Sequence, residues 1–240
     1  SNIANANVPG FKGERAVFRS FPDLLRVQMQ PQEEQERVVG KLGGGAALDE
    51  VFTNHASGQI VNTGVDTDMA IFGPGFFHVD TPQGERLTRN GSFTKDAQGF
   101  LRTSDGNYLL GQAGRIQIVE NEFFVNGEGE IFVERQRTTP IGTVETGRIR
   151  IDRLRMSQVG DPSVLEREGD SLYFLPAEAM EAIEPGDVQI GQGYLEMSNV
   201  SAIEESIRLI DNYRAYQSSQ RLVQAVDETL DKVINDVGRA

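Results

Sequence analysis

Two histidines, His55 and His78, are the first side chains to consider for acid–base catalysis or metal binding. They do not form a metal-spaced pair, and a three- or four-ligand site would need carboxylates that no motif supplies. The chain has no cysteine, which excludes a zinc–thiolate site, a cysteine nucleophile and a disulfide framework. We therefore interpret both histidines as structural and predict no metal site.

Two further segments begin like ligand-binding motifs. Asp66–Asp68 starts like a calcium loop, but Ile71 and Phe77 occupy the positions where that loop needs glycine and glutamate. Gly73–Gly75 lacks the third glycine and the following helix of a dinucleotide-binding loop, so it is better interpreted as a tight start to a strand. No serine lies in a Gly-x-Ser-x-Gly pattern. The sequence thus predicts no catalytic residue, no cofactor and no small-molecule substrate.

A basic cluster lies in a segment that alternates basic and apolar residues, as a half-buried strand would. Its simplest interpretation is a solvated strand face, and the alternative is a surface that docks against an acidic neighbouring subunit. The members of the cluster are Arg148, Arg150, Arg153 and Arg155.

The overall charge narrows the range of partners. The 36 acidic and 23 basic side chains leave a net charge of −13, concentrated in the last third of the chain. Such a chain is repelled by phosphate backbones and anionic lipid, so nucleic-acid binding is not expected. No apolar stretch approaches the roughly 18 residues that a bilayer requires, so membrane insertion is not expected either.

The middle of the chain has a strand-like period of two. Glycines recur at 84, 91, 99, 106 and 114, and β-forming residues lie between them. Asn90–Gly91 and Asp105–Gly106 are dipeptides typical of tight turns, and Asn126–Gly129 predicts another hairpin turn. We expect an antiparallel meander of short strands.

The last segment predicts one long helix. Ser201 to Val237 contains no glycine or proline, which gives a rod of roughly 55 Å. Ser201 and Glu204 form a capping box at its start, and Gly238 ends it. A seven-residue repeat, interrupted in its first half, predicts a coiled-coil-forming helix. The expected assembly seam consists of Leu209, Tyr216, Val223, Val226, Leu230, Val233 and Val237.

These elements predict a mainly β fold with a long α-helical terminal segment. We expect an N-terminal motif and connector over 1–59, with the connector near Gly43–Gly45, a β-rich outer domain over 60–190, and the helix over 191–240. No other segment offers an apolar stripe of matching length, and an isolated helix is marginal in water. The partner must therefore come from another chain, or from residues upstream of Ser1.

Several blocks resemble one known family. Ser1–Lys12 closely resembles the signature near the start of flagellar rod and hook proteins, the axial family of the bacterial basal body. The run from Thr63 to Phe77 looks like the central motif of that family, and Thr88–Phe93 and Asp105–Leu110 continue it. Gly193–Val200 is similar to its carboxy-terminal signature. These blocks follow the family's order over almost the whole chain, which makes the resemblance specific.

The resemblance implies a structural subunit that binds no cofactor and polymerises into a hollow shaft transmitting torque from motor to hook. The implied partners are further copies, other axial proteins and the flagellar type III export apparatus, which exports such proteins without signal cleavage. The implied location is the basal body, outside the cytoplasm in the periplasm or cell-wall layer. The family-motif residues are Ser1, Asn2, Asn5, Gly10, Phe11, Gly73, Gly75, Phe76, Phe77, Ser198 and Asn199.

Three alternatives remain at this point. A hook-type subunit is the nearest, although the short middle region argues against it. A secreted β-domain adhesin or binding module, oligomerised through its C-terminal helix, would bind a ligand as an isolated domain. A hydrolase would need a pocket in which titratable groups converge.

Overall fold

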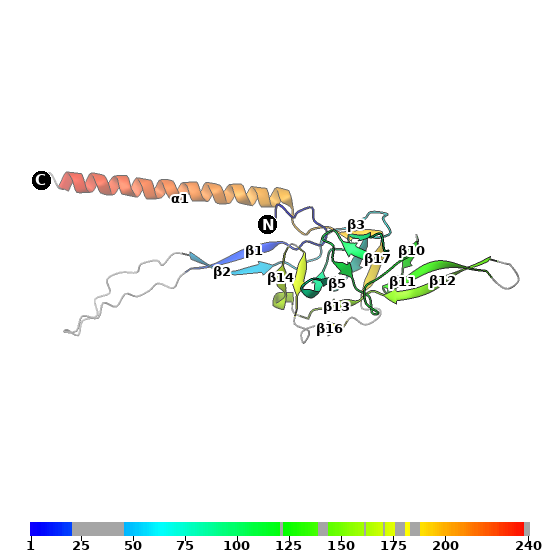
Figure 1. The fold of residues 1–240 in the computed structure, drawn as a ribbon. Helices are drawn as coiled ribbons and strands as arrows, with labels where there is room; N and C mark the ends of the chain where they lie inside the picture. Colours follow the sequence, from blue (N-terminus) through cyan, green and yellow to red (C-terminus); the bar gives the residue numbers. More distant parts are fainter. Residues whose placement is uncertain are drawn as a thin grey trace, which may run out of the picture.

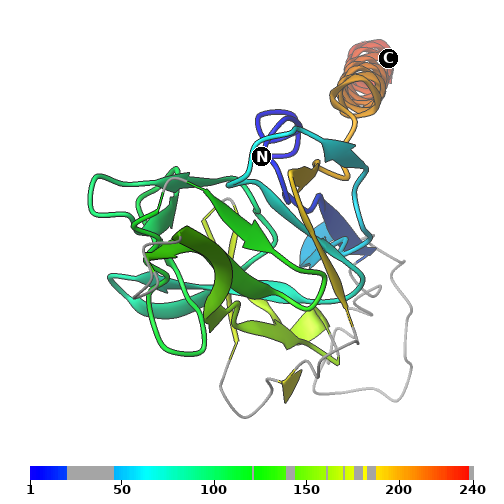
Figure 2. The same ribbon diagram turned by 90° about the vertical axis from the view of Figure 1, so that its right-hand side faces the viewer.

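The fold is described from a computed structural model that covers residues 1–20, 46–120, 122–138, 144–160, 162–169, 171–175, 181–182 and 188–237. Figure 1 shows a β-rich body from which α1 (Ala202–Val237) projects on the same side as β1 (Glu14–Ser20) and β2 (Ala46–Thr53). Figure 2 shows α1 end-on, beside the body and not over it. The predicted mainly β fold with a terminal helix is confirmed. The predicted connector near Gly43–Gly45 lies outside the described residues.

The largest described sheet is antiparallel and runs in the order β14-β15-β6-β5-β9-β8-β7, with β13 beside β5 and β16. Short 3₁₀ helix η1 spans Pro162–Val164. The meander is confirmed for β5–β6 and for β7–β8–β9, although β9 returns beside β5. The strands are β5 (Phe76–Thr81), β6 (Gly84–Thr88), β7 (Phe93–Lys95), β8 (Leu101–Thr103), β9 (Tyr108–Leu109), β13 (Met156–Gln158), β14 (Glu166–Glu168), β15 (Leu172–Phe174) and β16 (Glu181–Ala182).

The remaining strands form an arm and two bridges. β10 (Phe123–Val125), β11 (Glu130–Thr138) and β12 (Val144–Arg153) make a three-stranded sheet whose β11–β12 end points away from α1 (Figure 1). The bridges pair β4 (Met69–Phe72) with β17 (Gln189–Gln192), and β3 (Ile60–Asn62) with β18 (Tyr194–Glu196). These pairs return the C-terminal segment to the body just before α1 begins.

Two apolar cores lie on opposite faces of β5, because successive side chains of a strand alternate. Phe77 belongs to the main core, with Met69, Phe93 and Leu101 among its members. Phe76 belongs to the second core. The other members of the second core are Leu87, Val159, Leu165, Tyr173 and Leu175.

Two of the three predicted turns are confirmed. Asp105–Gly106 lies between paired strands β8 and β9, and Asn126–Gly129 between paired strands β10 and β11. The hairpin turn predicted at Asn90–Gly91 is wrong, because β6 and β7 do not pair. Gly91 instead allows close backbone approach, since a Cβ there would lie 1.6 Å from the Met69 carbonyl oxygen. Asn90 accepts a bond from the Ser92 amide through its Oδ1 at 2.9 Å, so its side chain serves an extended segment.

The helix begins where the sequence predicts. The Glu204 amide donates to Ser201 Oγ at 3.4 Å, and α1 runs for 36 residues, about 54 Å, to Val237. It is not apolar enough to cross a membrane, and no other described helix is long enough. A coiled-coil pairing stays a prediction, because the structure holds a single copy of α1.

The apolar side chains of α1 are exposed in the single chain. Leu209, Tyr216 and Leu230 are 63%, 60% and 53% exposed, and Val223 and Val226 are also exposed. The side chains of Val233 and Val237 lie outside the described residues. A second exposed group, Ile203, Ile207 and Ile210, recurs at intervals of four and three and so shares another face. The heptad pattern did not predict this second face.

Candidate functional site: the junction below the C-terminal helix

The N-terminal motif folds into a series of turns held by asparagine side chains. The side-chain Nδ2 of Asn5 donates to the Ser1 carbonyl at 3.3 Å, and the backbone amide of Val8 donates to the Asn5 carbonyl at 3.1 Å. Asn2 accepts from the Glu14 amide at 2.9 Å and donates to the Glu14 carbonyl at 2.8 Å, as a neighbouring strand would. Its Nδ2 also lies 3.4 Å from Glu205 Oε2, in the first turn of α1. The start of the chain therefore links β1 to the root of the helix.

Asn199 ties the two ends of the chain together. Its Oδ1 accepts from the Gly13 amide at 2.8 Å, and its Nδ2 donates to the carbonyls of Asn54 and Ala56 at 2.8 and 2.9 Å. The Gly10 amide donates to the Glu196 carbonyl at 2.7 Å. The amino- and carboxy-terminal motifs, far apart in sequence, thus form one hydrogen-bonded unit immediately before α1.

Three buried charged residues, Lys12, Arg89 and Glu196, form what we call the junction cluster. Lys12 Nζ lies 2.6 Å from Glu196 Oε1, and Arg89 Nε lies 3.3 Å from Glu196 Oε2. Their side chains are 1%, 5% and 2% exposed. Further bonds run from Gly58 N to Glu196 Oε1 at 2.8 Å and from Arg89 Nη2 to the Gly73 carbonyl at 2.6 Å. One carboxylate therefore connects the three family motifs.

Burial sets the electrostatics of the junction cluster. Loss of solvation lowers the pKa of the Lys12 ammonium, while its hydrogen bond to Glu196 acts in the opposite direction. Burial likewise lowers the pKa of the Arg89 guanidinium, and the Glu196 charge opposes the change. Both cations therefore depend on Glu196, and removing one member of such a pair typically costs about 3–5 kcal/mol.

Gly10 lies where the N-terminal motif crosses the backbone of Arg89. Its φ is +69°, and a Cβ there would lie 2.4 Å from the carbonyl carbon and oxygen of Arg89. We expect Gly10→Ala to lower the free energy of unfolding by about 2–4 kcal/mol, because backbone strain adds to a backbone clash. Near-ultraviolet circular dichroism during urea unfolding measures this loss through the packed aromatic rings.

Gly106→Ala is the matched control. Gly106 also has a positive φ, +89°, but nothing lies within 4 Å of a Cβ built on it. Its replacement should therefore cost only the strain, about 1 kcal/mol. Equal losses in the two variants would show that the contact between Gly10 and Arg89 does not hold the junction.

An aromatic group with His55 lies next to the junction cluster. The His55 ring centroid is 5.6 Å from that of Tyr173 and 6.3 Å from that of Phe76. Burial, then the charges of Lys12, Arg167 and Arg89, lowers the pKa of His55 to about 4. Burial raises the pKa of Tyr173 to about 12. Both side chains are therefore neutral at pH 7.

His78 makes the one arrangement in the described residues that resembles a catalytic triad. Its Nε2 lies 2.7 Å from Ser157 Oγ, and its Nδ1 bonds to Glu85, which also pairs with Arg155 at 3.3 Å. Ser157 is only 7% exposed on a strand paired on both sides, so its hydroxyl is not presented to a substrate. Burial lowers the pKa of His78. The imidazole joins β5, β6 and β13, an arrangement consistent with the structural interpretation of this histidine.

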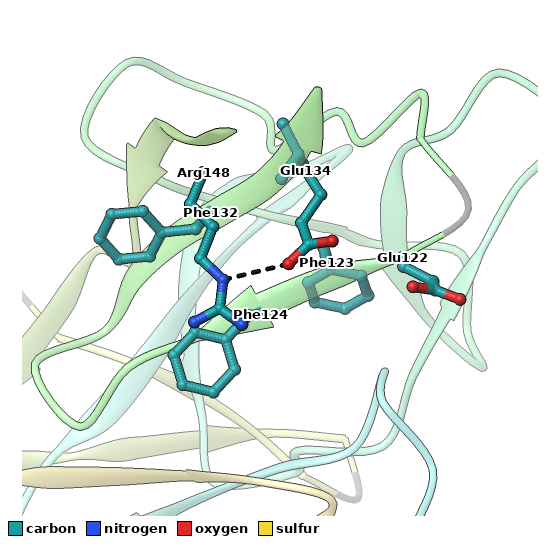
Figure 3. Close-up of a pocket in the computed structure, with 7 residues that line it drawn as sticks. Glu122, Phe123, Phe124, Phe132, Glu134 and Arg148 are labelled. Atoms are coloured by element: carbon teal, nitrogen blue, oxygen red, sulfur yellow. Dashed lines mark hydrogen bonds and ion pairs between the residues drawn. The ribbon is translucent and has the colours of Figure 1, made fainter. Parts of the chain in front are cut away.

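A cavity of about 150 Å³ lies on the arm (Figure 3). Figure 3 shows Arg148 above Phe124, with its guanidinium 5.5 Å from the ring centroid and its Nε 3.2 Å from Glu134 Oε1. The other lining residues are Glu122, Phe123, Phe132 and Val133. The lining contains two carboxylates, Glu122 and Glu134, and Arg148 pairs with Glu134, but it contains no serine or histidine.

The basic cluster has partners within its own chain. Arg148 pairs with Glu134 at 3.2 Å, Arg150 with Glu130 at 2.5 Å, and Arg155 with Glu85 at 3.3 Å. Arg153 Nε donates to the Glu128 carbonyl at 3.1 Å. This neutralisation favours a solvated strand face over docking against an acidic subunit.

The structure brings some motif residues together and separates others. Gly73 joins the junction through its carbonyl, while Phe77 lies in the main core and Ser198 accepts locally from the Val200 amide at 3.1 Å. Gly75 is buried between β4 and β5. The helix α1, which carries the seam, projects away from the β-rich body (Figure 1).

Sequence reasoning missed the roles of Lys12, Arg89 and Glu196. All three stand inside the recognised motifs, but a charge pair separated by 184 residues, such as Lys12–Glu196, leaves no local pattern. Only the folded structure, which brings the three motifs together, identifies these residues as a buried ion-pair cluster.

Two of the three junction motifs lie within known family regions. A family model described as the C-terminal part of flagellar basal body rod FlgEFG proteins matches residues 192–236, and one described as the flagellar hook protein FlgE/F/G D1 domain matches 70–133. The flagellar basal-body rod protein FlgF of Caulobacter vibrioides is 32% identical over 250 residues, covering all of this chain and 90% of the relative. The chain belongs to the flagellar basal-body rod protein family.

Other relatives of this rod protein agree. The flagellar basal-body rod protein FlgG of Bacillus subtilis is 30% identical over 250 residues, covering 98% of this chain and 90% of the relative. The flagellar hook-basal body complex protein FlhO of the same organism is 25% identical over 259 residues, covering all of this chain and 91% of the relative. The comparisons confirm the predicted family and give no support to the adhesin alternative.

The family regions also place the junction within a rod protein. The D1 region contains Arg89, and the C-terminal region contains Glu196, Asn199 and nearly all of α1. The junction cluster therefore joins the two regions that define the family to the N-terminal motif, which lies outside both matches.

Proposed function

We propose that this rod protein polymerises through α1 with further copies of itself and with other axial proteins of the basal body. As a structural protein of the flagellar basal-body rod, it then transmits torque from motor to hook through many side-by-side contacts. Its β-rich body forms the outer layer of the shaft, and the junction cluster fixes the direction in which α1 leaves that body.

The observation that carries this proposal is the exposure of α1. A helix with apolar residues on more than one face is normally covered on more than one side. Here the seam residues from Leu209 to Leu230 and the second face of Ile203, Ile207 and Ile210 are exposed to solvent. Neighbouring helices in a polymer wall would cover both faces, and the seven-residue repeat of the second half suits a coiled-coil contact.

The free energy of association favours a subunit that contacts several neighbours over one that forms a single helix pair. Covering the exposed half of a large apolar side chain contributes on the order of 1 kcal/mol, and association costs about 4–15 kcal/mol in lost freedom of motion. A single helix pair would barely offset this cost. A subunit that contacts several neighbours along the shaft would offset it well, which is consistent with assembly only in the polymer.

We further propose that the subunit passes through the flagellar type III export apparatus and acts outside the cytoplasm. A helix that packs little against its own body can be extended more readily during export than a buried one. The absence of cysteine suits an oxidising compartment, where free thiols cross-link. The proposed role requires no catalysis, small-molecule substrate, nucleic acid or membrane insertion. The net charge of −13 disfavours contact with nucleic acid and with anionic membranes.

Purified basal bodies test the location directly. We expect the chain to copurify with detergent-extracted hook–basal bodies, and its deletion to leave cells non-motile with incomplete rods. A probe of the culture medium provides the comparison. Recovery of the chain from medium or cell surface, together with complete basal bodies in the deletion strain, would overturn the proposal.

A further inference from the structure

Three buried polar atoms beside the junction cluster lack a hydrogen-bond partner among the described residues. They are His55 Nδ1, Arg89 Nη1 and Tyr173 Oη. The Arg89 side chain is 5% exposed and that of Tyr173 is fully buried. A buried donor left without a partner costs about 1–3 kcal/mol, more when it is charged, so three in one place require an explanation.

The three groups surround one aromatic ring. The guanidinium carbon of Arg89 lies 5.7 Å from the centroid of Phe76, and the Tyr173 ring lies 5.7 Å from the same centroid. The His55 ring lies 5.6 Å from Tyr173 and 6.3 Å from Phe76. These distances gather all three side chains around the Phe76 ring. His55 as a whole is only partly buried, although its Nδ1 is buried.

The charges of the paired residues that the structure describes around this group do not balance. Lys12 and Arg89 both face the single carboxylate of Glu196. The next cation, Arg167, pairs with Glu14 at 3.0 Å and lies 4.3 Å above the Phe11 ring. Counting these five side chains leaves one positive charge in excess, in a region where water screens it poorly.

We propose that Arg89, Tyr173 and His55 bind one small monovalent anion, of the size of chloride or a carboxylate group. Each supplies a donor: the Arg89 Nη1–H, the Tyr173 hydroxyl, and the Nδ1–H of neutral His55 in the appropriate tautomer. An anion accepts all three bonds and cancels the excess charge. A water molecule would accept two of these bonds and could donate to His55 Nδ1 in the other tautomer, but it would leave the charge uncompensated.

The anion stabilises the fold at the root of α1, because it binds groups that only the folded chain brings together. Unfolding separates Arg89 from Tyr173, 84 positions away, and from His55, 34 positions away, and the site disappears with it. Thermal stability therefore depends on the concentration of the right anion.

Thermal unfolding at constant ionic strength provides the test, with gluconate replaced stepwise by chloride, bromide or acetate. Gluconate has the same charge but is far bulkier than chloride or acetate. We expect the unfolding midpoint to rise saturably by about 2–4 °C as chloride reaches about 100 mM. Acetate distinguishes a carboxylate site from a halide site, and chlorine-35 line broadening reports binding without any substitution.

Variants locate the site. Tyr173→Phe removes one donor and keeps the ring, so the chloride midpoint should shift to roughly tenfold higher concentration. Arg115→Gln is the matched control, since Arg115 also lies over a tyrosine, 4.4 Å from the Tyr108 centroid, but is exposed. An unfolding midpoint that does not depend on the identity of the anion, or a response that Tyr173→Phe leaves unchanged, would overturn the proposal.

Discussion

Replacement of Glu196 by glutamine is expected to lower the free energy of unfolding by about 3–5 kcal/mol. Glutamine has the same shape, and its oxygen can still accept the bond from the Gly58 amide. It carries no charge, so Lys12 and Arg89 would remain buried as cations without a counter-ion. Urea unfolding followed by near-ultraviolet circular dichroism measures the loss.

Two further variants distinguish the junction from an ordinary ion pair. Lys12→Met should cost much less than Glu196→Gln, because Arg89 still balances Glu196 when the lysine is gone. Glu168→Gln breaks a pair with Arg86 in which the carboxylate is 48% exposed, and should cost about 0–1 kcal/mol. If Glu196→Gln costs no more than Glu168→Gln, the junction cluster is not what holds the three motifs together.

A single charge in the seam of α1 is expected to reduce incorporation into basal bodies about 100-fold. Val223→Lys and Leu230→Lys change side chains that are 58% and 53% exposed in the single chain. Each should therefore leave the stability of the monomer unchanged, yet bury an unpaired charge on assembly, at a cost of several kcal/mol. The measurement is the amount of variant chain recovered in purified basal bodies relative to wild type.

The control for the seam lies on the polar face of the same helix. Gln224 is exposed and stands near Arg221 and Glu228, which are three and four residues away. Gln224→Lys introduces the same charge and should assemble normally. Equal loss of assembly in Gln224→Lys and Val223→Lys would mean that the apolar seam does not specify the contact.

The elements that carry local signals could be predicted from the sequence. Ser201 and Glu204 located the start of α1, because capping depends on residues three apart. The Asp105–Gly106 turn was predictable because this dipeptide by itself favours a tight turn. Asn90–Gly91 has the same local signal but lies where Gly91 passes the Met69 carbonyl, a contact that only the folded sheet reveals.

The site itself was beyond sequence reasoning. Its motifs were recognised by resemblance, but the Lys12–Glu196 pair depends on β18 returning beside β3, which no local pattern encodes. The second apolar face of α1 was missed for a different reason. The heptad template fitted the second half of the helix, so Ile203, Ile207 and Ile210 fell outside the expected seam.

The central claim is that the seam of α1 is open in the free subunit and covered in the rod. Because the chain has no cysteine, a single cysteine at position 230 reports this directly through its rate of reaction with a maleimide. We expect Leu230→Cys to react at the rate of an unfolded peptide in the monomer and at least about 100-fold more slowly in intact basal bodies, the protection of a well-packed contact. Arg102→Cys, on the exposed side of β8, should react in both. Protection of position 230 in the monomer, or equal reactivity in monomer and basal body, would contradict the account.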